Sequence, residues 1–219
     1  TAAMDFGSAV HCKLLEPQKF DSRFAVAQTK FDRRTKAGKE AAEAFEKEHA
    51  GKIVLTSDDG SRLSRIVESC LAIPIVKEAL TTFEKEKELD LGDFKGKLDL
   101  VDLKNRVIID VKTTRDATAR EFVSQSLSLR YDIQLFHYAQ LLGLGPMPTV
   151  YTIAIESDSA QVACYDVTDI VISKFTHNRY QKALQTAYEV LEMKACPPKF
   201  STDIVNLTLP KWAIESESL

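Results

Sequence analysis

The sequence lacks the features that mark several classes of protein. Its four cysteines are widely scattered and form no Cys-x-x-Cys pair, so neither a zinc site nor an iron–sulfur cluster is encoded in recognisable form. No stretch approaches the roughly 20 apolar residues of a membrane span, and no signal peptide is visible. The formal net charge of −3 does not indicate nucleic-acid binding, although a protein with a negative net charge can still contain a local basic channel. Scattered cysteines suit a reducing compartment, so we expect a cytoplasmic protein with no membrane partner.

The features that are present suit one domain. The chain has 219 residues, of which 44% are hydrophobic, and this is enough to bury a sizeable core. It contains no internal repeat and no low-complexity linker, so we expect residues 1–219 to form a single domain. The first residue is Thr1 rather than Met, and we therefore expect that an N-terminal piece of the domain is missing.

Hydrophobic spacing predicts a mixture of helices and strands. Helical patterns cover 1–16, 35–50, 57–80 with an interruption at Pro74, 118–128, 133–143 after a cap at Asp132, and 169–193. Strand patterns cover 53–55, 81–91, 98–103, 107–111, 149–156 and 160–167. The alternating charges of residues 81–91 suit an edge strand. Residues 17–34 show no clean period, and we expect an irregular, partly basic segment. The fold class is therefore α/β, with a mixed sheet of about five strands flanked by helices.

The strands at 98–103 and 107–111 carry the main functional prediction. A hairpin turning at Lys104-Asn105 sets residues whose numbers sum to 209 opposite each other, so Asp99 faces Asp110. Directly opposite Cβ atoms lie roughly 5 Å apart, where like charges are destabilising. Lys112 shares a face with Asp110 but is too far along the strand to neutralise both carboxylates alone. A divalent metal is the simplest counter-ion, and this set of groups suits phosphodiester hydrolysis.

Other polar residues have two interpretations on spacing alone. His11, within the helix 1–16, is either a solvent-facing or core-edge histidine or a metal ligand. Gln134 and Tyr138 are four apart on one helix face, where they form either a surface pair or a shared contact to a ligand. The basic residues of the irregular segment either meet phosphates or belong to a solvated loop; they are Arg23, Lys30, Arg33 and Arg34.

Several motifs together resemble a known family of nucleases. Residues 96–99 followed by 109–114 resemble the core of the PD-(D/E)xK superfamily, and residues 131–138 are similar to the Gln-xxx-Tyr motif of its RecB-like branch. Residues 6–11, with 15–17 after them, resemble the helix that supplies a histidine ligand in RecE-type exonucleases (exonuclease VIII). The tail at 197–213 also resembles that group. The motifs occur in the family's order over most of the chain.

The resemblance implies a role for each matching residue. Asp99 and Asp110 would bind a metal, and His11 and the backbone carbonyl of Val111 would complete its shell. Lys112 would be the catalytic lysine. The implied ion is Mg²⁺, with Mn²⁺ as an alternative, and the implied fold is a restriction-endonuclease-like core.

The same resemblance implies an activity and partners. The expected enzyme is an exodeoxyribonuclease that digests linear double-stranded DNA from 5′ to 3′, with Gln134 and Tyr138 lining the DNA path. The expected assembly is a ring-shaped homo-oligomer working with a single-strand annealing protein, in the recombination of phage or prophage DNA inside a bacterial host cell. Two alternatives remain: a RecB-like endonuclease or single-strand nuclease, and a catalytically silent DNA-binding module.

The sequence departs from the family pattern, or leaves it open, at three points. Relatives continue upstream of Thr1 with another helix, which contributes to the DNA entrance. Relatives often carry a Glu on the strand before the hairpin, and here Glu84, Glu86 and Glu88 compete for that role. The hairpin arithmetic also sets Lys97 opposite Lys112, so either the strands splay there or both lysines serve the same phosphate of the DNA.

Overall fold

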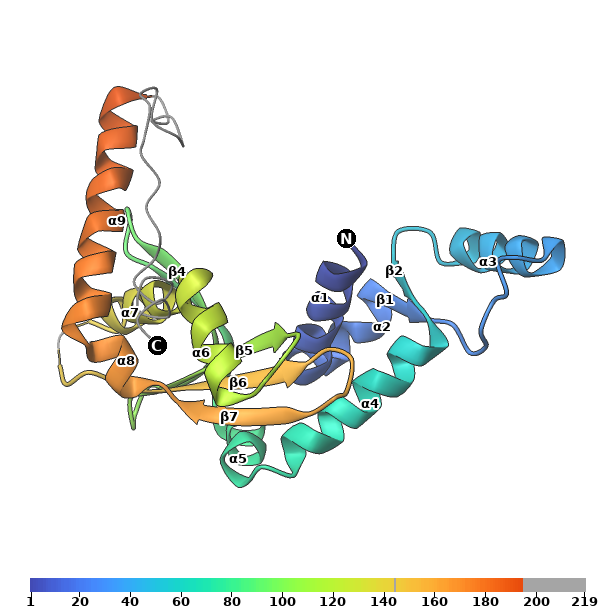
Figure 1. Ribbon diagram of the computed structural model, residues 1–219, viewed down its shortest axis with the longest axis horizontal. Coiled ribbons are helices and arrows are strands. Elements are labelled where there is room, and N and C mark those ends of the chain that lie inside the picture. The colour runs from blue at the N-terminus through green and yellow to red at the C-terminus, as the bar shows by residue number, and fades with distance from the viewer. Residues whose placement is uncertain (144, 195–219) are drawn as a thin grey trace, which may run out of the picture. The chain divides into compact units, whose positions relative to one another are not determined.

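A computed structural model describes residues 1–143 and 145–194 (Figure 1). The chain divides into two compact units, Thr1–Tyr180 and Gln181–Leu219, of which the second is described only as far as residue 194. The predictions for Trp212 and for the tail motif fall outside the described residues. Within the described residues, no helix is long and apolar enough to cross a membrane.

Two sheets form the framework of the first unit. The larger has the strand order β3-β4-β5-β6-β7, formed by Glu84–Asp90, Lys95–Asp102, Val107–Thr114, Thr149–Glu156 and Val162–Asp166. Strands β5 and β6 are parallel, whereas the other neighbours are antiparallel. The predicted mixed sheet of about five strands is therefore confirmed, with the charged strand β3 at its edge. A second sheet pairs β1 (Phe24–Val26) with β2 (Ile53–Leu55) in parallel.

Nine α-helices occur in the described residues. They are α1 (Ala2–Leu15), α2 (Phe20–Arg23) after a 3₁₀ turn at Pro17–Lys19, α3 (Lys36–Glu48), α4 (Ser57–Leu71), α5 (Pro74–Thr82), α6 (Ala119–Ser128), α7 (Tyr131–Leu141), α8 (Thr168–Ile172) and α9 (Lys174–Met193). The crossover between the parallel strands β5 and β6 contains α6 and α7, as a parallel connection requires.

Three details of the sequence prediction were wrong. Residues 17–34 contain α2 and β1, which are too short to show a hydrophobic period. Asp132 lies inside the first turn of α7 and is buried, while Arg130, in the left-handed region with φ of 64°, precedes the helix. The predicted helix 169–193 breaks at Ser173, whose hydroxyl accepts a hydrogen bond from the backbone N–H of Thr176 at 3.1 Å.

The core has one layer on each face of the larger sheet. On one face α1, α4 and α5 pack against Leu100, Ile109 and Val111. On the other face α7 and α8 pack against residues that include Leu98 and Ile108. Residues two apart on a regular strand share a face, yet Leu98 and Leu100 lie in opposite layers. Strand β4 therefore switches face at residue 99, next to the candidate site.

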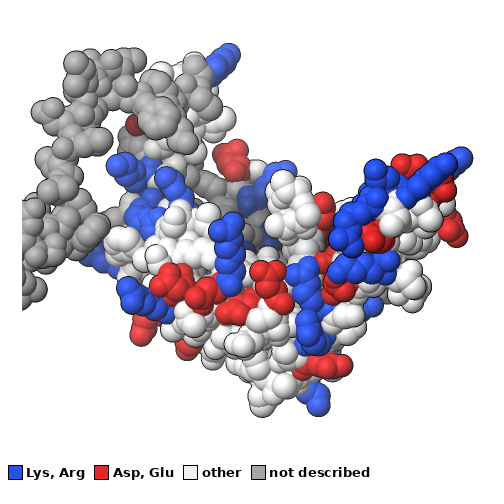
Figure 2. Space-filling view, turned by 45° about the vertical axis from the view of Figure 1, so that its right-hand side comes forward, with Lys and Arg blue, Asp and Glu red and all other residues white. Residues whose placement is uncertain are grey.

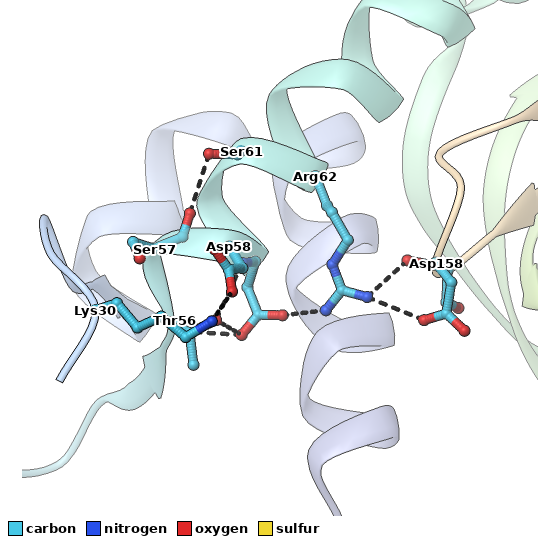
Figure 3. A network of polar contacts seen from close by, with 9 residues as sticks. Lys30, Thr56, Ser57, Asp58, Ser61, Arg62 and Asp158 are labelled. Atoms are coloured by element: carbon cyan, nitrogen blue, oxygen red, sulfur yellow. Dashed lines mark hydrogen bonds and ion pairs between the residues drawn. The ribbon is translucent and has the colours of Figure 1, made fainter. Parts of the chain in front are cut away.

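Arg62 of α4 contacts its own helix, the β6–β7 turn and α1 (Figure 3). Its guanidinium donates to Asp59 on its own helix, and to the backbone carbonyl of Ser157 and the carboxylate of Asp158 in the β6–β7 turn, at 3.0 and 3.1 Å. It also lies 4.5 Å from the ring centroid of Phe6 in α1. This contact fixes α1, and thus the helix that carries His11, against the sheet.

Candidate active site

The site forms where β4 and β5 separate. Their ladder follows the predicted register from Asp102↔Val107 to Leu100↔Ile109 and ends one step short of Asp99 and Asp110. Instead of facing Asp110 in a regular ladder, the Asp99 carboxylate accepts a hydrogen bond from the backbone N–H of Val111 at 2.7 Å. Since Lys97 also lies beyond the last pair, the strands splay there, which is the first of the two possibilities that the sequence left open.

Glu86 is the glutamate of β3 that reaches the site. The flanking pairs Lys85↔Leu100 and Lys87↔Leu98 place it opposite Asp99, but the two residues are not paired in the ladder. Its φ is 52°, a left-handed conformation that a residue other than glycine rarely adopts in a strand. Such strain costs about 1–3 kcal/mol and is typical of functional positions. The sequence offered Glu84, Glu86 and Glu88 equally, and only the backbone geometry distinguishes them.

His11 approaches the same point from α1. One turn earlier, a Cβ built on Gly7 would lie 3.2 Å from the Thr113 hydroxyl, so the glycine allows α1 to pack closely against β5. His11 Nδ1 lies 3.7 Å from Asp99 Oδ1. One ligand atom each from His11, Glu86 and Asp99 lie within 4.8 Å of one another. Burial lowers the pKa of His11, which favours the neutral imidazole that binds metals.

Asp110 and Lys112 form a buried ion pair beside this cluster. The Asp110 residue is 2% exposed, and Lys112 Nζ lies 2.8 Å from Oδ2 and 3.0 Å from Oδ1. Only the contact with Oδ1 has hydrogen-bond geometry, so Oδ2 has no hydrogen-bond partner among the described residues. Burial disfavours the lysine's charge, but the Asp110 carboxylate more than compensates, and the pKa of Lys112 is raised. The lysine thus stays protonated at neutral pH.

Asp99 carries the most perturbed carboxyl group of the site. Burial, together with the negative charge of Asp110, raises its pKa from 3.8 to about 7, although the N–H of Val111 and the charge of Lys112 act in the opposite direction. A carboxylate that is costly to ionise without a cation is a suitable ligand for one.

Lys97 and Tyr131 also border the site. Lys97 forms an ion pair with Glu86, which raises the pKa of the lysine. The ring of Tyr131, at the start of α7, lies under the Lys112 ammonium at 4.8 Å from its centroid. Sequence reasoning included Tyr131 in a motif but gave it no role, because its contact with Lys112 depends on how α7 packs on the sheet.

The predicted pair Gln134 and Tyr138 lies deeper than its spacing suggested. The Gln134 amide donates to the Tyr138 hydroxyl at 2.7 Å, and Tyr138 is only 9% exposed. A Cβ on Gly96 would lie 3.0 Å from the Tyr138 ring, so this glycine lets the ring pack directly on β4. A role for the pair in contacting DNA remains a prediction.

A cavity of about 610 Å³ opens in front of these groups. The predicted residues that line it are His11, Lys97, Asp99, Val111 and Lys112. Glu86, one of the three glutamates that the sequence offered, lines it as well, as does Arg23, which the sequence left open as a phosphate contact. Glu16 and Tyr131 also line it, and the sequence gave neither of them a role. One imidazole nitrogen and two carboxylates are a donor set that divalent cations accept, and the cavity leaves room for water and a substrate. The arrangement can therefore hold a metal ion next to a protonated lysine.

Comparisons with known proteins identify a family and a similar solved structure. A family model described as a PDDEXK-like domain of unknown function, DUF3799, matches residues 1–202. No curated protein matches the chain. Among solved structures, that of a phage related exonuclease from Haemophilus somnus 129PT is similar over 78% of this chain and 91% of that chain, with 14% identity and a TM-score of 0.37. A likeness at that level carries no argument about this chain.

Proposed function

The chain belongs to the PDDEXK-like family DUF3799, and we propose that it is a divalent-metal-dependent exonuclease that hydrolyses the phosphodiester bonds of linear double-stranded DNA. The observation that carries this proposal is the cluster of His11, Glu86 and Asp99 next to the buried Asp110–Lys112 pair. A fold kept only for binding has no need of an ionisable cluster that raises the pKa of Asp99 to about 7.

The donor groups fit a metal ion. Asp110 has a buried carboxylate oxygen without a hydrogen bond, and Glu86 occupies a strained backbone conformation beside Asp99. In our proposal His11, Asp99 and Asp110 hold the ion together with the carbonyl of Val111, as the family resemblance implied, and Glu86 joins them. We favour Mg²⁺, with Mn²⁺ as a substitute, because most of these ligands are oxygen atoms.

The remaining residues of the site have roles that follow from their charge and place. A bound divalent ion would polarise the phosphate and lower the pKa of a bound water. Lys112 carries its proton at neutral pH, so its ammonium can orient the attacking oxygen and offset charge that develops on the phosphate. Lys97, half-exposed at the cavity, can contact the next phosphate of the DNA once its partner Glu86 binds the ion.

The finer parts of the proposal rest on the motifs of the chain. The resemblance to RecE-type exonucleases supports digestion from 5′ to 3′, a ring-shaped homo-oligomer and a single-strand annealing partner in phage or prophage recombination. Gln134 and Tyr138 would line the DNA path through the pair that they form with each other.

One substitution tests the catalytic part of the proposal. We expect Asp110→Asn to reduce Mg²⁺-dependent digestion of linear duplex DNA by at least about 100-fold while the far-UV circular dichroism spectrum is retained. Asp93→Asn is the matched control, because it removes the same charge from an exposed turn between β3 and β4. Full activity of Asp110→Asn would refute the assignment of the site.

Two DNA substrates test the type of nuclease. An exonuclease leaves covalently closed circles intact, and a 5′ label is released as mononucleotide before a 3′ label if digestion runs from 5′ to 3′. Cleavage of closed circles would identify an endonuclease instead. Absence of Mg²⁺ and Mn²⁺ binding in calorimetry, together with absence of digestion, would leave a silent DNA-binding module.

A further inference from the structure

A second basic feature lies outside the site, between β1 and the first turn of α3. Residues 28–39 contain five cations and one acid, a local net charge of +4 in a chain whose total is −3. We call this segment the basic arm; its cations are Lys30, Arg33, Arg34, Lys36 and Lys39. In Figure 2 Lys and Arg side chains gather over the arm and α3 at the right of the view.

The cations of the arm are accessible. The side chains of Arg34 and Lys36 are each 91% exposed, and they pair only with Asp32 and Glu40. Lys30 pairs with Asp58 and Arg33 with Glu46, also at the surface. Lys39 is exposed and has no ion pair among the described residues. Such surface pairs contribute little to stability, so phosphate oxygens can replace the carboxylates at small cost.

The arm nevertheless has a defined structure. Lys30 Nζ donates to Asp58 at the start of α4 at 3.1 Å, a contact at the base of the loop (Figure 3). The first turn of α3 lies so close to the loop that a Cβ on Gly38 would be 2.0 Å from the Asp32 carbonyl oxygen. Phe31 packs on Phe45 of α3, with ring centroids 5.7 Å apart. The cations therefore project from a fixed turn.

The first turn of α3 has charges of the wrong sign for helix stability. The amino end of a helix has a partial positive charge and favours anions. Lys36 and Lys39 lie in this turn, which contains no acidic residue, whereas the acidic residues of α3 follow from Glu40 onward. Thr35 caps the helix through its hydroxyl, which accepts from the N–H of Gly38 at 3.0 Å. A bound anion would offset the repulsion between these lysines and the helix amino end, and helix amino ends are common binding sites for phosphate.

The chain connects the arm directly to the cavity. Arg23 lines the cavity, and β1 begins at the next residue. Lys30 is seven residues after Arg23, which is at most about 24 Å of extended chain. Along one DNA strand this corresponds to about seven nucleotides. A duplex with one strand in the cavity therefore extends far enough for its backbone to reach the arm.

We propose that the basic arm binds the phosphate backbone of duplex DNA, with Lys30 at its base within about seven base pairs of the bond held in the active-site cavity. This inference rests on the proposed function, because it takes DNA as the substrate. These contacts would not depend on the DNA sequence, since lysine and arginine side chains and a helix amino end bind the phosphates and not the bases.

A charge-matched pair of variants tests the proposal. The arm variant carries Arg34→Gln, Lys36→Gln and Lys39→Gln, and the control carries Lys77→Gln, Lys104→Gln and Lys174→Gln, which are also exposed. Affinity for a 30-base-pair duplex is measured by fluorescence anisotropy in EDTA at several salt concentrations, so that no hydrolysis is involved. We expect the arm variant to bind about 10- to 100-fold more weakly, with a salt slope less steep by about 2 to 3, and the control to match wild type.

A second variant separates loss of contact from loss of fold. Lys36→Gln with Lys39→Gln removes only the cations of the first turn, so α3 should be as stable as in wild type or more stable. Weaker DNA binding with an unchanged melting temperature supports the arm as a phosphate contact. Equal affinity and salt slope in both arm variants and wild type would overturn it, as would a change only in oligomeric state, which would identify a protein contact.

A small substrate distinguishes failure of this inference from failure of the proposed function. Thymidine 5′-p-nitrophenyl phosphate has a single phosphodiester and no flanking DNA backbone for the arm to bind, so the arm variants should hydrolyse it at the wild-type rate with Mg²⁺. On long duplex DNA they should show a raised KM with little change in kcat. If wild type hydrolyses neither substrate, the proposed function fails, while the anisotropy measurement still decides whether the arm binds DNA.

Discussion

Replacing Asp99 by Asn tests whether the site destabilises the fold when no metal is bound. Asp99 is nearly buried, and burial together with the charge of Asp110 raises its pKa from 3.8 to about 7. Asparagine has the same shape, and its oxygen can accept the same hydrogen bond from the Val111 N–H. The substitution therefore removes the buried charge and little else.

The sign and size of the effect follow from the two pKa values. Below about pH 4 the carboxyl group is protonated in both the folded and the unfolded chain, so it contributes nothing. Between pH 4 and 7 only the folded protein holds the proton, so its free energy of unfolding falls by about 1.4 kcal/mol for each pH unit. The loss reaches at most about 4 kcal/mol at pH 7 and is constant above it. Asp99→Asn should thus be about 2 to 4 kcal/mol more stable than wild type at pH 8, and within about 1 kcal/mol at pH 4.5.

The measurement is urea unfolding followed by circular dichroism at pH 4.5, 6 and 8 in EDTA. Asp93→Asn controls for the loss of one negative charge and should remain within about 0.5 kcal/mol of wild type at each pH. With excess Mg²⁺ wild type should gain stability and the Asp99→Asn variant should gain less, because the ion binds the folded state. Parallel pH curves for wild type and Asp99→Asn, or a less stable variant at pH 8 in EDTA, would refute the reasoning.

Three other predictions concern the packing that supports the site. Arg62→Ala should lower the free energy of unfolding by about 2 kcal/mol in the same urea titration, because it removes the ion pairs and the stacking on α1. Asp158→Ala should change the free energy of unfolding by less than about 0.5 kcal/mol, because the Asp158 side chain is 94% exposed. Gly96→Ala should lower the melting temperature and cost about 1–3 kcal/mol, since its Cβ would approach Leu141 Cδ1 to 2.5 Å and the Tyr138 ring to 3.0 Å; an unchanged melting temperature would show that these side chains can move. Burial raises the pKa of Cys70 to about 12, so iodoacetamide at pH 8 should label it only after unfolding, as peptide mass spectrometry can show.

The register of the hairpin and the edge position of β3 could be predicted from the sequence. Turn chemistry at Lys104-Asn105 fixes which residues face each other, and the ladder has that register from Asp102 to Leu100. Alternating charges along residues 84–90 suit a strand with one free edge, and β3 is the first strand of the sheet. Both are local patterns, so a single sequence is enough to recognise them.

The parallel pairing of β5 with β6 depends on long-range contacts. The two strands are separated by α6 and α7, and nothing in the local sequence states which strand β6 will join. The same crossover places α7 over the sheet, and this puts Tyr131 under Lys112. The contact therefore could not be inferred from spacing.

The sequence by itself predicted the main groups of the site: two aspartates and a lysine on adjacent strands, for which residue types and strand period are sufficient. The histidine on the first helix was added by the family resemblance. Only the tertiary structure decided how these groups meet. The face switch of β4 at Asp99 and the left-handed backbone at Glu86 bring that glutamate, and neither Glu84 nor Glu88, into the cluster with His11. Backbone distortions of this kind are maintained by packing on both faces of a sheet, and a residue pattern does not encode them locally.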